Sequence, residues 1–116
     1  NTASRADMAK AAAAVLTSDG HENRIYEFAA PKLWTMKELA QILSDVSGKP
    51  VELKPATAAE YAKILAGSGM PEPAAAMFAA LYAQLEEGEF AQTSDDLTRL
   101  IGETTPLEAV VKRALA

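Results

Sequence analysis

The residues of this sequence best suited to act as bases or metal ligands are one histidine and two acidic clusters. His21 lies in the turn at residues 20–23, where a general base would still need an orienting partner and a pocket. We therefore expect a solvated loop histidine. Three glutamates fall within residues 86–89 and two aspartates at 95–96, but neither cluster has the spacing of a calcium-binding loop. The pattern predicts no metal site and assigns no catalytic residue.

The tyrosines and glycines also lack the spacing of a redox site. Tyr26, Tyr61 and Tyr82 could act as acids, but none is followed four residues later by the lysine of a Tyr-x-x-x-Lys pair. The glycines at residues 67–69 follow a helical pattern rather than a strand, and the full Gly-x-Gly-x-x-Gly phosphate loop is absent. The sequence thus contains no complete catalytic or cofactor-binding motif.

Large aromatic side chains are the best candidates for contact with a ligand. Phe78 and Tyr82 lie four residues apart on one face of a predicted helix, with Met77 and Leu81 beside them, and Trp34 is a further candidate. Such a face most often packs in a core, and it lines a ligand cleft where two halves of a protein meet. The substrate pocket is predicted to comprise Met77, Phe78, Leu81, Tyr82 and Phe90.

Start signals and apolar periodicity predict about six helices. At four places a Ser or Thr is followed three residues later by an acidic residue, which is the spacing of a capping box. These pairs are Ser4 with Asp7, Thr35 with Glu38, Thr57 with Glu60, and Thr105 with Glu108. The first helix is expected over 5–17. Two further helices are expected over 73–87 and through 97–101, the latter capped by Thr93 or Ser94.

Two short segments are predicted to be strands. Residues 24–29 alternate polar and apolar side chains, and residues 51–54 follow the intervening helix. This order suggests a right-handed crossover between two parallel strands, so the fold class is α/β and mostly helical. Because two parallel strands make a poor independent sheet, we expect the rest of a sheet to come from another part of the protein.

Composition excludes several function classes. The chain has 116 residues, enough for one domain, a net charge of −5 and no cysteine. The acidic balance argues against binding to nucleic acid or to anionic membranes. No apolar run approaches the roughly 20 residues of a membrane span, and we expect a cytoplasmic protein. Asn1 stands in place of an initiator Met, and a predicted helix follows at once, so we expect the chain to start mid-protein.

Taken in order, several short motifs resemble the C-terminal part of NmrA-like proteins, an atypical branch of the short-chain dehydrogenase superfamily. The chain is most similar to the NAD(P)H:quinone oxidoreductase type. The likeness spans nearly the whole chain, and the order and spacing of the motifs carry it. The motifs are Ala3–Ala9, His21–Phe28, Trp34–Ala40, Ser47–Val51, Gly69–Pro71, Gly88–Phe90, Ser94–Gly102 and Thr104–Leu107.

This resemblance implies a parent protein whose N-terminal Rossmann half binds NADP(H) or NAD(H). Residues 1–116 would then form one C-terminal, substrate-side lobe, with that Rossmann half and a small-molecule substrate as its partners. The parent would transfer hydride to a quinone-like or other small apolar substrate. For the isolated chain we expect no cofactor binding and a tendency to self-associate. A non-catalytic, NADP(H)-sensing regulator is the alternative, and a self-standing helical interaction module is a third.

Overall fold

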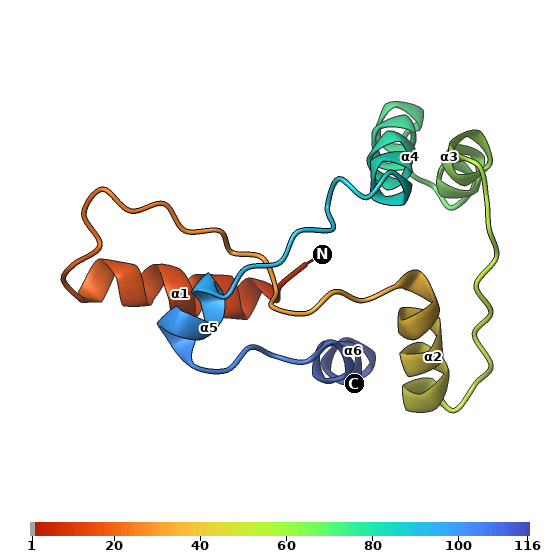
Figure 1. Ribbon diagram of the computed structural model, residues 1–116. Helices are drawn as coiled ribbons and strands as arrows, with labels where there is room; N and C mark the ends of the chain where they lie inside the picture. The colour runs from red at the N-terminus through yellow and green to blue at the C-terminus, as the bar shows by residue number, and fades with distance from the viewer. Residues whose placement is uncertain (1) are drawn as a thin grey trace. The chain divides into compact units, whose positions relative to one another are not determined.

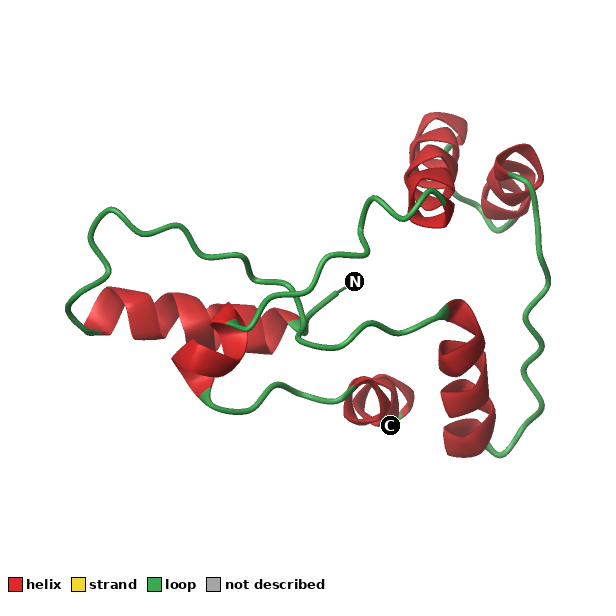
Figure 2. Cartoon of the chain, viewed as in Figure 1, coloured by secondary structure: helices red, strands yellow, loops and turns green. Residues whose placement is uncertain are grey.

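The computed structural model describes residues 2–116, apart from the side chain of Glu86, and shows an all-helical arrangement (Figures 1 and 2). The helices are α1 (Arg5–Thr17), α2 (Met36–Ser47), α3 (Ala58–Gly67), α4 (Glu72–Glu86), α5 (Asp96–Ile101) and α6 (Leu107–Leu115). They belong to two compact units. Unit 1 contains α1, α2, α5 and α6 within residues up to Leu53 and from Gln92 onward, and unit 2 is Lys54–Ala91 with α3 and α4.

Unit 1 is built from two helix pairs. Helix α1 packs against α5, and α2 packs against α6. Ala11 on α1 and Leu97 on α5 are fully buried, while Val111 on α6 is nearly so. The small side chain of Ala11 allows the backbones of α1 and α5 to approach closely, and Leu97 supplies the large buried side chain of this helix pair. The core of this unit is small, as the alanine-rich composition predicts.

Unit 2 is a helical hairpin of α3 and α4. Ala75 and Ala79 lie one turn apart on α4 and are its buried residues. The rings of Tyr61 and Tyr82 meet edge to face, with centroids 4.9 Å apart and an interplanar angle of 74°. The larger apolar side chains Met77, Phe78, Leu81 and Tyr82 of that helix are exposed.

Local signals set most helix ends correctly. The capping boxes at Thr35 and Thr57 are both complete. Each threonine hydroxyl accepts from the backbone N–H of the glutamate at the third helical position, and the backbone N–H of the threonine donates to the carboxylate of that glutamate. Gly48 ends α2 with a φ of +68°, a left-handed conformation that glycine adopts without strain. Helix α1 spans the predicted residues 5–17.

The fourth predicted capping box is wrong. Pro106 occupies the N-cap of α6 and no side chain caps that helix, because the hydroxyl of Thr105 donates instead to the carboxylate of Asp7. In α5 the cap is Asp95, although the Ser94 hydroxyl does accept from the backbone N–H of Asp96. At α6 a contact with a residue distant in sequence redirects the Thr105 side chain. At α5 the cap lies one residue later than Ser94.

The two predicted strands are also wrong within the described residues, where no β-strand occurs. Residues 24–29 are extended, but the backbone N–H of Glu27 donates to the Asp96 carboxylate at 2.9 Å rather than to a neighbouring strand. The N–H of Val51 donates to the Ser44 hydroxyl at 2.9 Å. Alternating side chains favour an extended backbone, but a strand needs a paired backbone beside it, and the chain provides none for these segments.

Candidate functional site

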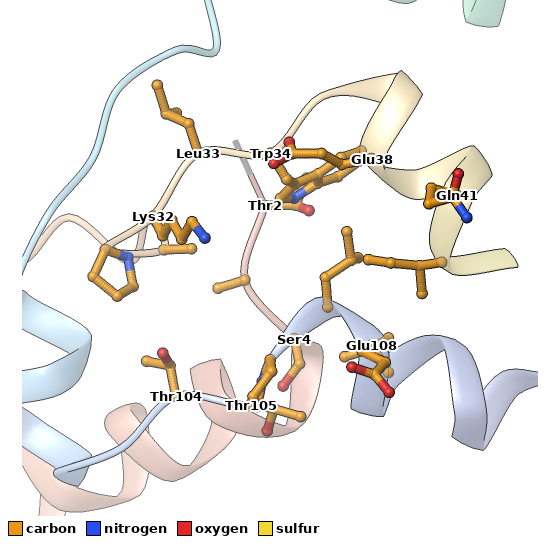
Figure 3. A pocket seen from close by; sticks show the side chains of 17 residues that line it. Thr2, Ser4, Lys32, Leu33, Trp34, Glu38, Gln41, Thr104, Thr105 and Glu108 are labelled. Atoms are coloured by element: carbon orange, nitrogen blue, oxygen red, sulfur yellow. The ribbon is translucent and has the colours of Figure 1, made fainter. Parts of the chain in front are cut away.

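Unit 1 contains a cavity of about 450 Å³ (Figure 3). That volume lies within the range of about 300–1,000 Å³ usual for small-molecule pockets. Its wall comes from the residues before α1, the loop before α2, α2 itself, the turn that leads into α6, and the first turn of α6. The lining residues are Thr2, Ala3, Ser4, Ala30, Pro31, Lys32, Leu33, Trp34, Glu38, Gln41, Ile42, Thr104, Thr105, Pro106, Leu107, Glu108 and Val110. Apolar side chains predominate in this wall, with a few charged groups among them.

A buried carboxylate holds two sides of this cavity together. Asp7 is only 1% exposed, and its two oxygens accept from the backbone N–H of Thr105 at 2.7 Å and from the Thr105 hydroxyl at 2.9 Å. The backbone N–H of Asp7 donates to the Ser4 hydroxyl at 3.0 Å. Because Ser4 and Thr105 both line the cavity, Asp7 fixes the first turn of α1 against the turn that precedes α6.

The hydrogen bonds to Asp7 keep it ionised. Burial by itself would raise the pKa of this carboxyl, but the donors on Thr105 and Ser4, together with the charge of Lys10, lower the pKa below its usual value. The Lys10 ammonium lies 3.8 Å from the carboxylate. A charge inside the fold is therefore compensated by donors from residues 98 positions away.

The Asp7 role was missed in the sequence because its spacing from Ser4 suggests a capping box. The first half of that motif is present, but the carboxylate turns to Thr105 instead of the helix start. One signal was available, since Asp7 and Ala11 are one turn apart and share the buried stripe of α1. An ionisable residue on a buried stripe needs a partner.

Three charged side chains line the cavity, and two of them are engaged. Glu38 accepts from the backbone N–H of Thr35 at 2.7 Å and from its hydroxyl at 3.1 Å, and these bonds, more than the Lys32 charge, lower the pKa of Glu38. Glu108 forms an ion pair of 2.6 Å with Lys112. Lys32 forms no ion pair within 4 Å among the side chains that the structure describes.

Trp34 lines the cavity, and its side chain is half-buried. In Figure 3 its indole and Glu38 lie together at one side of the cavity, while Lys32 extends from the loop toward its interior. The sequence singled out Trp34 only as a large aromatic residue. The structure adds what a pattern could not, namely which residues far along the chain face it.

The predicted pocket residues lie elsewhere, in unit 2. Four of them, Met77, Phe78, Leu81 and Tyr82, project from α4, and Phe90 follows that helix. All five are exposed, and none lines the cavity of unit 1. The structure thus brings four of them together as one exposed apolar stripe, and their role as a pocket stays a prediction.

Tyr61 is a weak candidate for an acid. Burial, together with the contact with Tyr82, raises its pKa above the usual value for tyrosine. A phenol whose pKa is raised gives up its proton less readily near neutral pH. The pair therefore serves packing between α3 and α4.

His21 is not the freely solvated residue that its turn suggests. It is half-buried, its Nε2 lies 2.9 Å from the Ser18 hydroxyl, and its Nδ1 lies 2.6 Å from the Tyr26 hydroxyl. The Ser18 hydroxyl also donates to the backbone carbonyl of Ala14 at 2.7 Å. The contacts among these three side chains link the end of α1 to the following loop.

Within the described residues no group of three or more His, Asp or Glu side chains converges as a metal site. No helix in that part of the chain has the length and apolar character needed to cross a membrane.

Solved structures of two reductases resemble this chain closely. It is 48% identical to triphenylmethane reductase of Citrobacter sp., with a TM-score of 0.97, and the match covers 99% of this chain and 40% of that one. The same enzyme has been solved in complex with NADP(H), with a TM-score of 0.96. An NADPH-dependent quinone oxidoreductase from Escherichia coli is 36% identical, with a TM-score of 0.91, and the match covers 99% of this chain and 42% of that one.

Sequence comparison gives consistent relatives. Quinone oxidoreductase 2 of Escherichia coli (strain K12) is 38% identical over 104 residues, which cover 90% of this chain and 36% of that protein. NAD(P)H azoreductase of Xenophilus azovorans is 32% identical over 96 residues, 83% of this chain and 34% of that protein. No family model matches the chain. The chain spans about a third of the length of these curated relatives.

Proposed function

Because the chain belongs to the NmrA-like reductases and corresponds to their C-terminal part, we propose that it is the substrate-side part of an NAD(P)H-dependent oxidoreductase. The parent protein would transfer hydride to a quinone-like or other small apolar substrate. The observation that carries this proposal is the 48% identity, at a TM-score of 0.96, to a reductase solved with NADP(H).

The names of the relatives support the kind of substrate. The relatives are named for quinones, azo compounds and triphenylmethane dyes, and these substrate classes share conjugated π systems. A conjugated ring system can accept a hydride and spread the charge that results. The cofactor supplies the hydride, and the protein orients and shields the two reactants. The same features of this chain suit such a role, since it offers apolar surfaces and no reactive group of its own.

The cofactor would be held outside this chain. A dinucleotide site needs a glycine-rich turn between a strand and a helix, and the residues described contain no strand. The buried carboxylate of Asp7 is already satisfied by Thr105 and so does not suit a ribose contact. We therefore assign NADP(H) or NAD(H) to a nucleotide-binding half of the parent protein.

That half would pack on the extended segment at residues 24–29. Ile25 in this segment is 89% exposed, a large apolar side chain left in water. Tyr26 and Phe28 alternate with it and are half-buried, so one face of the segment rests on unit 1 while the other is open. A strand of the nucleotide-binding half, paired with this backbone, would supply the ladder that is missing here, and an element packed on the face of that sheet would cover Ile25.

The exposed stripe of α4 would serve the substrate. Met77, Phe78, Leu81 and Tyr82 present a continuous apolar surface, and Met77 is 62% exposed. An apolar surface of this kind marks a binding surface more often than it is left open in a finished protein. We propose that these residues, with Phe90, line the cleft between the two halves and that both units form one substrate-side lobe.

The test is a spectrophotometric assay of the full-length protein with NADPH and a panel of benzoquinones and naphthoquinones. The expected result is quinone-dependent oxidation of NADPH by the full-length protein. We expect the 116-residue chain to show no such activity and weak or no calorimetric affinity for NADPH. The absence of oxidation across the panel would refute the proposal. Tight NADPH binding without turnover, together with capture of a protein partner, would favour the sensor instead.

A further inference from the structure

The cavity of unit 1 offers a second ligand site, distinct from the α4 stripe. Its lining residues all belong to one compact unit of this chain. Its volume of about 450 Å³ suits a small molecule. The buried Asp7 carboxylate accepts two hydrogen bonds from Thr105 and so holds this lining residue of the cavity in place.

Its wall selects for a flat aromatic ring. Trp34 presents an indole to the cavity, and a ring that stacks or meets it edge to face gains contact beyond simple burial. Opposing apolar side chains come from α2 and α6, including Ile42 and Val110, so a ring would be enclosed by apolar surface from more than one element. An aliphatic chain would also fit this wall, but it would not use the indole face.

The wall also holds one group that can bond an anionic oxygen on that ring, the Lys32 ammonium. A cation would be attracted by the indole face. However, the carboxylate of Glu38 already receives two hydrogen bonds from Thr35, and that of Glu108 is paired with Lys112 at 2.6 Å. The Lys32 ammonium has three donors and forms no ion pair within 4 Å among the described side chains, although its charge does act on Glu38.

We propose that this cavity binds a flat aromatic ring bearing an anionic oxygen group, with Trp34 against the ring and Lys32 bonded to the oxygen. The proposal goes beyond the reductase function, since it concerns binding by this chain alone and includes no reduction step. Its success or failure is therefore independent of the NADPH assay.

The experiment is calorimetry of the 116-residue chain with three naphthalenes that share one ring system and differ in charge. They are 2-naphthoate, 2-naphthol and 2-naphthyltrimethylammonium. We expect the naphthoate to bind about fivefold more tightly than the neutral naphthol, which is the usual effect of one exposed ion pair, and the cation to bind most weakly. Equal affinities for all three, or tightest binding of the cation, would overturn the proposal.

Two variants, each with a control, test the roles of Lys32 and Trp34. Lys32→Met removes the exposed donor and should abolish the preference for naphthoate, while Lys37→Met, an exposed lysine of α2 that does not line the cavity, should preserve it. Trp34→Leu should weaken all three naphthalenes, whereas Phe78→Leu on the α4 stripe should not. Loss of affinity in the Phe78 variant, with full affinity in the Trp34 variant, would place the ligand on α4 and refute the site in unit 1.

Discussion

The contact between Asp7 and Thr105 is expected to be the most costly single contact to remove in this chain. Both carboxylate oxygens accept from Thr105, at 2.7 and 2.9 Å, and the side chain is 1% exposed. A hydrogen bond to a charged group contributes about 1.5–3 kcal/mol, and a buried donor that loses its acceptor costs about 1–3 kcal/mol. Small domains have a total stability of about 5–15 kcal/mol, so this contact is a large share.

Two substitutions separate charge from hydrogen bonding. Asp7→Asn keeps the shape and one acceptor oxygen, so the bond from the Thr105 N–H survives without its charge. We expect it to lower the free energy of unfolding by about 2 kcal/mol. Asp7→Ala leaves the Thr105 N–H and hydroxyl both without an acceptor and opens a void, so we expect about 4 kcal/mol. At this chain length each kcal/mol lowers Tm by about 4 °C.

Urea and thermal unfolding, followed by circular dichroism at pH 7, measure both values. Asp19→Asn is the matched control, because Asp19 is exposed in the turn after α1 and should change stability by no more than about 0.5 kcal/mol. A double-mutant cycle with Thr105→Val isolates the pair, with an expected coupling of about 1–2 kcal/mol. An Asp7→Asn variant as stable as the control, with no coupling, would refute the reasoning.

Three further predictions follow from other contacts. Because the pKa of Asp7 is lowered in the folded state, its stabilising contribution is complete above the ordinary pKa of aspartate, about 3.9, and is lost as pH falls below that value toward the folded pKa. Asp7→Asn should therefore reduce the dependence of the unfolding free energy on pH in acid titrations. Thr57→Ala removes the cap of α3 and should cost about 1 kcal/mol in urea unfolding, while Thr93→Ala, which caps no helix, should be neutral. Ile25→Lys should leave the stability of the 116-residue chain unchanged, since Ile25 is 89% exposed, but should impair folding or activity of the full-length protein; equal yield and turnover would count against strand pairing there.

Helix position and several helix ends could be predicted from sequence, because the signals are local. A threonine and a glutamate three residues apart satisfy each other's backbone groups at Thr35 and Thr57, whatever surrounds them. A glycine at residue 48 ends α2 for the same kind of reason, since its left-handed φ is a property of one residue. The resemblance to the NmrA-like family could also be inferred from the sequence, because it depends on the order of motifs along the chain.

The candidate site could be predicted only in part, because it depends on contacts between distant residues. Thr105 matched a capping signal as well as Thr35 did, yet the buried Asp7 recruits it from 98 positions away. The alternation at residues 24–29 indicated an extended backbone but not whether a partner strand lies beside it. Trp34 was a candidate by residue type and Lys32 was not singled out, and only folding brings α6 and the turn before it to the same cavity. Sequence therefore determined the local conformations of this protein, and tertiary structure decided which polar groups are paired and which are left to bind.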